Sequence, residues 1–115
     1  MTIQTKRIYE APADADGYRV LVDRLWPRGI SHERTHLDLW AKDITPSTAL
    51  RNEFHSGIDN YNEFVAAYLD ELRNNPAMPE FVAEIKKHKI VTLLTATRDP
   101  AHSHVPVLIK YLSRK

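Results

Sequence analysis

The chain has 115 residues, a length that favours one domain with a single moderate core. Its 43% hydrophobic and 27% charged residues are typical of a soluble globular protein, and a net charge of +1 gives no overall reason to expect nucleic-acid binding. The chain contains no cysteine, which excludes disulfides, thiolate metal sites and cysteine nucleophiles.

The amino-terminal segment MTIQTKRIYE lacks the apolar core of a signal peptide. No apolar run approaches the roughly 18 residues that would indicate a membrane span. We therefore expect a cytoplasmic protein with no membrane association. Internal repeats and Gly/Ser linkers are absent from the sequence, so residues 1–115 are predicted to form a single domain.

The first half of the chain contains three segments with strand patterns. Residues 3–9 alternate loosely and suit an outer strand with a turn after it. Residues 18–22 form a nearly continuous apolar run, which indicates a strand covered on both faces, as in a parallel sheet. Residues 37–44 alternate apolar and polar side chains and indicate a further strand.

Helix signals follow in the middle of the chain. Thr45 is predicted to cap a helix whose first residue is Pro46. Asn60 and Glu63 resemble a capping box before a run of apolar residues at helical spacing. A third helix is expected over residues 79–88.

The last third of the chain predicts a strand and a final helix. Residues 90–97 are apolar for most of their length and indicate the central strand. Pro106 belongs in a first helical turn, which makes Ser103 the expected cap. Strands that alternate with helices predict an α/β fold with a small, mainly parallel sheet of about four strands flanked by helices.

Polar residues gather where the two buried strands end. In open parallel sheets, ligands bind beyond the carboxyl ends of the strands. The first strand is followed by Asp23, Arg24, Trp26 and Arg28, and the second delivers Thr95, Thr97, Arg98 and Asp99. Three guanidiniums beside a helix start would suit a small phosphate, sulfate or carboxylate ligand, provided that the two strands are neighbours.

A structural interpretation of the same residues stays open. Asp23 could pair with an arginine, Trp26 could fill the core and Arg28 could face water. Ser103 beside His104 suggests a nucleophile and its base, but adjacent helical residues project about 100° apart, which favours a capping role for Ser103. Ser47, Arg51 and His55 share a helix face that turns either to the crevice or to solvent.

Histidines and arginines raise two further alternatives. His102 and His104 lie near the start of the last helix, and a metal site would need a third ligand, for which His55 is the candidate, as well as supporting groups. We therefore predict no metal site and keep the three histidines as candidates only. The arginines near the strand ends lie in no recognised nucleic-acid-binding motif, so nucleic acid is not an expected partner. Exposed helix faces would allow a monomer or a homodimer.

Several long segments, in order, resemble the bacterial YeaO-like family, a domain of unknown function: GYRVLVDRLWPRGI, LDLWAKDITPSTALRNEFH, FVAAYLDEL and VTLLTATRDPAHSHVPVLIKYL. The resemblance covers nearly the whole chain and implies a compact α/β fold. A longer related branch has Asp and Arg at the positions of Asp23 and Arg24, and an Asp-Pro-x-x-Cys-His segment resembling DPAHSH. Only Asp99, Pro100 and His104 match that segment, because Ser103 replaces the cysteine.

The leading hypothesis is an α/β protein with an anion-binding crevice for a phosphorylated or carboxylated small molecule, on which it could act as an enzyme. Its arginines would neutralise the ligand, while Asp23 or His104 would handle a proton. The alternatives are a non-catalytic binding or interaction module and a histidine-dependent metal protein. No cofactor is indicated.

Overall fold

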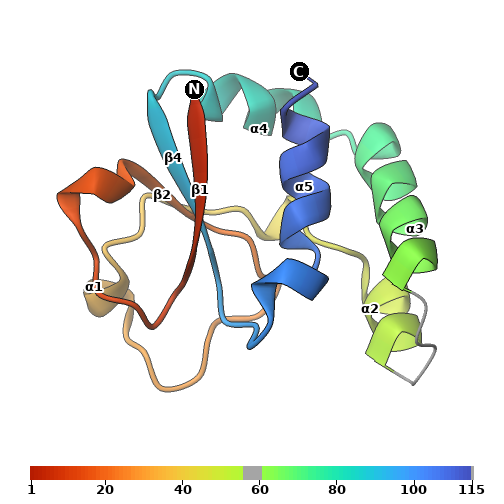
Figure 1. Ribbon diagram of the computed structural model, residues 1–115, viewed down its shortest axis with the longest axis horizontal. Coiled ribbons are helices and arrows are strands. Elements are labelled where there is room, and N and C mark those ends of the chain that lie inside the picture. Colours follow the sequence, from red (N-terminus) through yellow and green to blue (C-terminus); the bar gives the residue numbers. More distant parts are fainter. Residues whose placement is uncertain (56–60, 115) are drawn as a thin grey trace.

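Four parallel strands form one sheet in the order β1-β4-β2-β3 (Figure 1). The computed structural model describes residues 1–55 and 61–114, apart from the side chains of Phe54 and His55. The strands are β1 (Thr2–Arg7), β2 (Tyr18–Leu21), β3 (Leu39–Trp40) and β4 (Ile90–Thr95). β4 pairs with β1 along its whole length and with β2 from Tyr18↔Val91 to Leu21↔Leu94. The expected α/β fold with a parallel sheet is confirmed.

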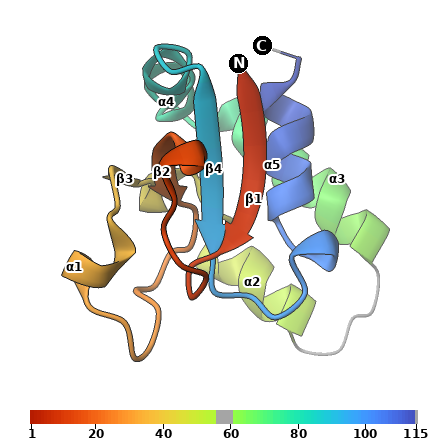
Figure 2. The same cartoon turned by 60° about the vertical axis from the view of Figure 1, so that its left-hand side comes forward.

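Helices cover the sheet unequally. The α-helices are α1 (His32–Thr35), α2 (Thr48–His55), α3 (Tyr61–Asn74), α4 (Met78–Ile85) and α5 (Val105–Leu112). Figure 1 shows α2 to α5 on one side of the strands and α1 on the other, and Figure 2 shows α5 beside β1 with α3 behind it. None of the helices in the described ranges has the length and apolarity needed to cross a membrane.

The main core lies between the sheet and the larger helical layer. Val20, Val91 and Leu93 from the strands join Tyr68 of α3 and Leu108 of α5, and all five are fully buried. Burial of aliphatic side chains on this scale is the dominant favourable contribution to folding. The long apolar runs of β2 and β4 therefore identify the two inner strands.

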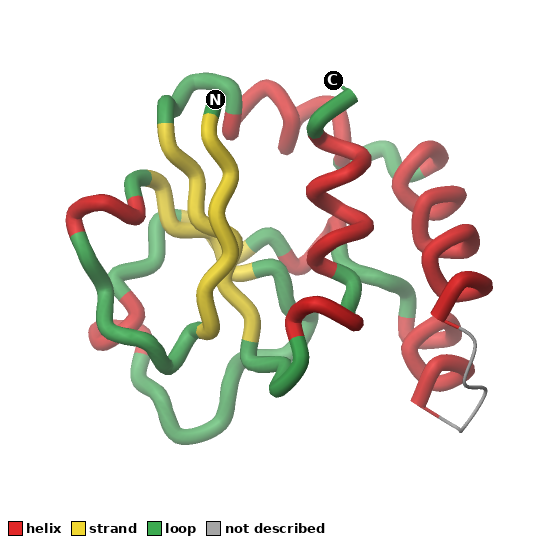
Figure 3. Tube along the Cα trace, viewed as in Figure 1, coloured by secondary structure: helices red, strands yellow, loops and turns green. Residues whose placement is uncertain are grey.

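The other face of the sheet is covered mainly by long loops, which are interrupted only by short helical segments such as α1 (Figure 3). Leu21 and Leu94 are buried there against Trp26, Leu37 and Trp40. Trp26 and Leu37 of the chain between β2 and β3 thus pack against this face together with Trp40 of β3, which positions the residues that follow β2.

The strand predicted over residues 37–44 is wrong in most of its length. Residues 37–44 form a strand only over Leu39–Trp40 and then a 3-10 turn over Lys42–Ile44. The buried residues Ala41 and Ile44 lie three apart, a spacing that a 3-10 turn satisfies and a strand does not.

The second helix begins later than predicted. The Thr45 hydroxyl donates to the Lys42 carbonyl oxygen (2.7 Å) and caps no helix. Helix α2 starts at Thr48, and Ser47 provides the cap because its hydroxyl accepts a hydrogen bond from the Leu50 amide (3.1 Å).

The remaining boundaries differ in detail. Helix α4 covers Met78–Ile85 and stops before the predicted end at residue 88. The amides of Lys87 and His88 donate to the carbonyl oxygens three residues earlier, those of Glu84 and Ile85, which is the pattern of a 3-10 turn and not of an α-helix. Asn60, the proposed first member of a capping box, lies outside the described residues. Helix α5 begins at Val105, and His104, which directly precedes it, makes no side-chain cap hydrogen bond. Ser103, one residue earlier than His104, accepts a hydrogen bond from the Val105 amide with its hydroxyl (3.1 Å) and so satisfies the first amide of the helix.

Candidate functional site

The carboxyl ends of β2 and β4 lie side by side and open onto a hollow of about 470 Å³. The Val22 amide donates to the Leu94 carbonyl oxygen (3.0 Å), so the two chains stay paired up to the point where their polar residues begin. The predicted site residues that line the hollow are Asp23, Arg24, Trp26, Arg28, Arg51, Thr97, His102, Ser103 and His104.

Other predicted site residues lie elsewhere. Thr95 is fully buried beneath the hollow. Arg98 and Asp99 are exposed and are not part of its lining, and the Asp99 carboxylate contacts Nδ1 of His102 (2.9 Å) at the surface. The side chain of His55 lies outside the described part of the structure. The arginines at the hollow are therefore Arg24, Arg28 and Arg51.

The Asp23 carboxylate ties the two strand ends together. Its Oδ1 accepts a hydrogen bond from the Thr95 hydroxyl (2.8 Å), and its Oδ2 accepts one from the Ala96 amide (2.7 Å). Nε2 of His104 lies 3.4 Å from the same Oδ1. β4 ends at Thr95 because the next amide bonds to this carboxylate instead of a neighbouring strand. The sequence-based alternative of an Asp23–arginine pair is wrong.

These contacts determine the charge of Asp23. Burial alone would raise the pKa of this carboxyl, but hydrogen bonds from His104, Ala96 and Thr95 outweigh burial and lower the pKa below its ordinary value of 3.8. Asp23 is therefore a stable carboxylate at neutral pH. A group with this pKa is a poor proton acceptor.

His104 is held by the backbone of β2. Its Nε2 lies 2.6 Å from the Val22 carbonyl oxygen, which can only accept a hydrogen bond. Nε2 therefore carries the proton, and in the neutral ring Nδ1 is the basic atom. Nδ1 has no hydrogen-bond partner within residues 1–55 and 61–114.

The arginines come from two separate segments. Arg24 and Arg28 follow β2, whereas Arg51 belongs to α2. Nε of Arg24 donates to the Pro46 carbonyl oxygen (3.3 Å), which holds this side chain against the start of the α2 segment. None of the three forms an ion pair with a carboxylate of the described residues, so their positive charges remain available to a ligand.

Ser103 and Trp26 are engaged in structure. The Ser103 hydroxyl donates to the Pro100 carbonyl oxygen (2.7 Å) and accepts from the Val105 amide, which accounts for its proton and one lone pair. Trp26 stacks on His32 with ring centroids 3.6 Å apart, and its indole N–H donates to the Ile30 carbonyl oxygen (2.9 Å). Ser103 therefore caps the first amide of α5, and Trp26 forms part of the wall of the hollow.

Sequence reasoning missed two apolar residues at the rim of the hollow. Tyr9 and Leu25 line it and are 46% and 65% exposed. Tyr9 follows β1, and its hydroxyl donates to the Arg28 carbonyl oxygen (3.1 Å). Both residues could have been found from their place in the sequence, because each lies just beyond the carboxyl end of a strand and therefore at the same edge of the sheet.

No group of three or more metal-ligating side chains that could hold an ion occurs within the described ranges. His102 and His104 both line the hollow, but His104 uses Nε2 for the Val22 carbonyl and His102 contacts Asp99.

Comparison with known proteins places the chain in a family. Its sequence is 44% identical over 112 residues to the uncharacterized protein YeaO of Escherichia coli K12, with 97% of each chain covered. It is 38% identical over 111 residues to the uncharacterized protein Rv3073c of Mycobacterium tuberculosis H37Rv, covering 96% of this chain and 93% of that one. No solved structure matches. A family model described as the inactive DUF488-N3 subclade matches residues 2–115, and the chain belongs to this YeaO-like family.

Proposed function

We propose that this protein binds a small organic anion in the hollow at the ends of β2 and β4 and does not transform it. The observation that carries the proposal is the set of three guanidiniums, Arg24, Arg28 and Arg51, which line one hollow without a carboxylate partner among the described residues. Guanidinium groups match the planar, multidentate geometry of carboxylates and phosphates.

The rim of the hollow favours an organic anion over an inorganic one. A volume of about 470 Å³ lies in the range of small-molecule pockets and far exceeds the space that one phosphate group fills. Leu25 and Tyr9 supply exposed apolar surface next to the arginines. A ligand with a carboxylate or phosphate head and an apolar body would use both surfaces.

The groups with catalytic potential argue for binding without turnover. Both carboxylate oxygens of Asp23 accept hydrogen bonds from Thr95 and Ala96. The Ser103 hydroxyl is hydrogen-bonded to Pro100 and Val105 at the start of α5. The description of the subclade as inactive is consistent with this assignment. A cytoplasmic location is our expectation for such a protein.

An enzyme that acts on the same class of anion is the second candidate. His104 favours it, because this residue lines the hollow and its Nδ1 is without a partner in the described ranges. Turnover of an aryl phosphate or ester that His104→Ala abolishes would support this candidate over simple binding.

The test of binding is the melting temperature in the presence of phosphate, citrate, benzoate and phenyl phosphate, each against chloride. A ligand at a hundredfold excess over its Kd stabilises the native state by about 2.7 kcal/mol, which corresponds to several degrees for a chain of this size. Phenyl phosphate should give the largest shift, because it combines the anion with an apolar ring.

Variants identify the site. Arg51→Gln should remove most of the ligand-induced shift, whereas Arg98→Gln, a matched control at an exposed arginine outside the hollow, should retain it. The comparison uses the shift and not the melting temperature itself, so a small change in stability does not interfere. Equal losses in both variants, or no shift of the wild-type protein with any anion, would refute the proposal.

A further inference from the structure

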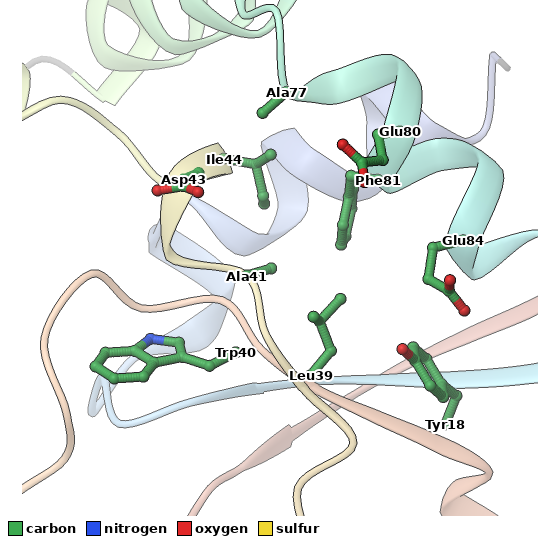
Figure 4. A pocket seen from close by; sticks show the side chains of 10 residues that line it. All are labelled: Tyr18, Leu39, Trp40, Ala41, Asp43, Ile44, Ala77, Glu80, Phe81 and Glu84. Atoms are coloured by element: carbon green, nitrogen blue, oxygen red, sulfur yellow. The ribbon is translucent and has the colours of Figure 1, made fainter.

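A second hollow, of about 320 Å³, lies between β3 and α4, away from the arginines of the first (Figure 4). Phe81 extends from α4 and Leu39 rises from β3 on opposite sides of it, and Tyr18 of β2 adds its ring and hydroxyl. Ala41, just before the 3-10 turn, and Ile44, the last residue of that turn, complete the apolar part. This volume is at the lower end of the range for small-molecule pockets.

The charged residues that line this hollow are all acidic: Asp43, Glu80 and Glu84. Glu84 already has two neighbours, since its carboxylate contacts Nζ of Lys87 (3.4 Å) and Nε2 of His88 (3.3 Å). Hydrogen bonds from His88 and Lys87 hold the pKa of Glu84 below its ordinary value, so it is ionised at neutral pH. Asp43 and Glu80 are exposed, and their carboxylates have no ion-pair partner among the described residues.

The lining also offers a polar group and aromatic rings. The Tyr18 hydroxyl makes no hydrogen bond to any described residue, and Figure 4 shows the Glu84 carboxylate on the same side of the hollow. At the rim, Nζ of Lys42 already lies 4.9 Å from the centroid of the Trp40 ring. Aromatic faces attract cations in this way, and ammonium groups gain most where water is partly excluded.

We propose that this hollow binds a small organic cation, an ammonium group carried on a short aliphatic or aromatic body. The apolar walls receive the body, and Asp43 and Glu80 at the rim attract the charge. An organic anion would meet carboxylates and no Lys or Arg in the lining. A bare metal ion would need three or more converging ligands, and the described residues contain no such group.

The experiment is an NMR titration of the 15N-labelled full chain with phenethylammonium at neutral pH. Two analogues of the same shape separate charge from apolar contact: 2-phenylethanol is neutral and phenylacetate is anionic. The amine should produce saturable shifts at the amides of Ala41, Ile44 and Phe81. The alcohol should bind there at least threefold more weakly, and the anion should leave these amides unchanged.

The double variant Asp43→Asn/Glu80→Gln should weaken amine binding roughly fivefold, since two exposed charges attract the ammonium group only modestly through water. Both side chains are exposed, so the variant is expected to fold, and the unchanged dispersion of its NMR spectrum verifies this. Glu33→Gln removes one negative charge from an exposed position on α1 outside the hollow and should leave the affinity unchanged. Equal binding of amine and alcohol, equal losses in the two variants, or shifts centred elsewhere would overturn the proposal.

Discussion

His104 joins α5 to the carboxyl end of β2: its Nε2 lies 2.6 Å from the Val22 carbonyl oxygen and 3.4 Å from Oδ1 of Asp23. The same carboxylate accepts hydrogen bonds from Thr95 and Ala96 at the end of β4. One imidazole and one carboxylate therefore hold two strands and a helix together at the floor of the arginine-lined hollow. This clamp fixes the floor of the hollow, and it accounts for both oxygens of Asp23.

Replacement of Asp23 by Asn should lower the free energy of unfolding at about pH 7 by roughly 2–3 kcal/mol, because hydrogen bonds to a charged acceptor are lost and an amide N–H₂ faces other donors. Since the folded protein lowers the pKa of Asp23, the carboxylate stabilises the native state above its ordinary pKa of 3.8, and this contribution is lost as the pH falls through the folded-state pKa. Urea denaturation of both proteins across this pH range measures the difference.

The difference in unfolding free energy between wild type and Asp23→Asn should thus be constant above roughly pH 5 and shrink in acid. Asp99→Asn is the control, because this carboxylate is 66% exposed and should change stability by less than about 0.5 kcal/mol. A difference that widens as the pH falls would contradict the assignment of Asp23 as a stabilising carboxylate.

Ser103→Ala should cost about 1 kcal/mol of stability, since the Val105 amide loses its capping acceptor. The ligand-induced shift in melting temperature should stay as in wild type, because the hydroxyl is engaged with the Pro100 carbonyl and the Val105 amide. Ser113→Ala, at the exposed end of α5, is the control and should be nearly neutral. Loss of anion binding in Ser103→Ala alone would show that the hydroxyl has a role beyond the cap.

The fold at the site follows from a strong sequence signal. The apolar runs at β2 and β4 lack the alternation of a strand with one exposed face, and this predicts them as the inner strands of a parallel sheet. The polar residues that follow these two strands therefore meet at the same edge of the sheet. Asp23, Arg24 and Thr97 could be predicted as neighbours for this reason.

The partners of the site residues could not be predicted in the same way. Asp23 bonds to the amide of Ala96, and His104 bonds to a backbone carbonyl, and neither contact leaves a pattern in the sequence. Arg98 appeared equivalent to Arg24, but the chain turns after β4 so that Arg98 is exposed outside the hollow. The second hollow, between β3 and α4, depends on the 3-10 turn at Lys42–Ile44. The alternation of apolar and polar residues there led to the prediction of a strand.

A buried ion pair beneath the opposite end of the sheet predicts a larger effect. Asp16 and Arg19 are 3% and 4% exposed and form an ion pair, and Lys6 lies 3.1 Å from Oδ1 of Asp16. Asp16→Asn should lower the unfolding free energy by about 3–5 kcal/mol, because it leaves the Arg19 guanidinium buried without a charge partner. Lys6→Gln, whose side chain is 20% exposed, should cost clearly less. Chemical denaturation gives both values, and the reverse order would exclude the Asp16–Arg19 pair as the dominant contact.

Gly17 precedes β2 with φ +64° and ψ −129°, a conformation that only glycine adopts without strain. A Cβ at this position would lie 2.3 Å from the Ile90 carbonyl oxygen, a clash with backbone that no side-chain movement relieves. Gly17→Ala should therefore destabilise the protein by more than about 3 kcal/mol.

Gly29 provides a matched comparison for Gly17. Its φ is also positive, at +77°, but a Cβ there would have no neighbour within 4 Å. Gly29→Ala should cost only about 1 kcal/mol, the price of the backbone conformation alone. Thermal or urea denaturation of the two alanine variants measures the difference, which isolates the contact with Ile90. Similar losses in both would mean that backbone strain, and not the close approach of β2 to β4, determines the need for glycine at position 17.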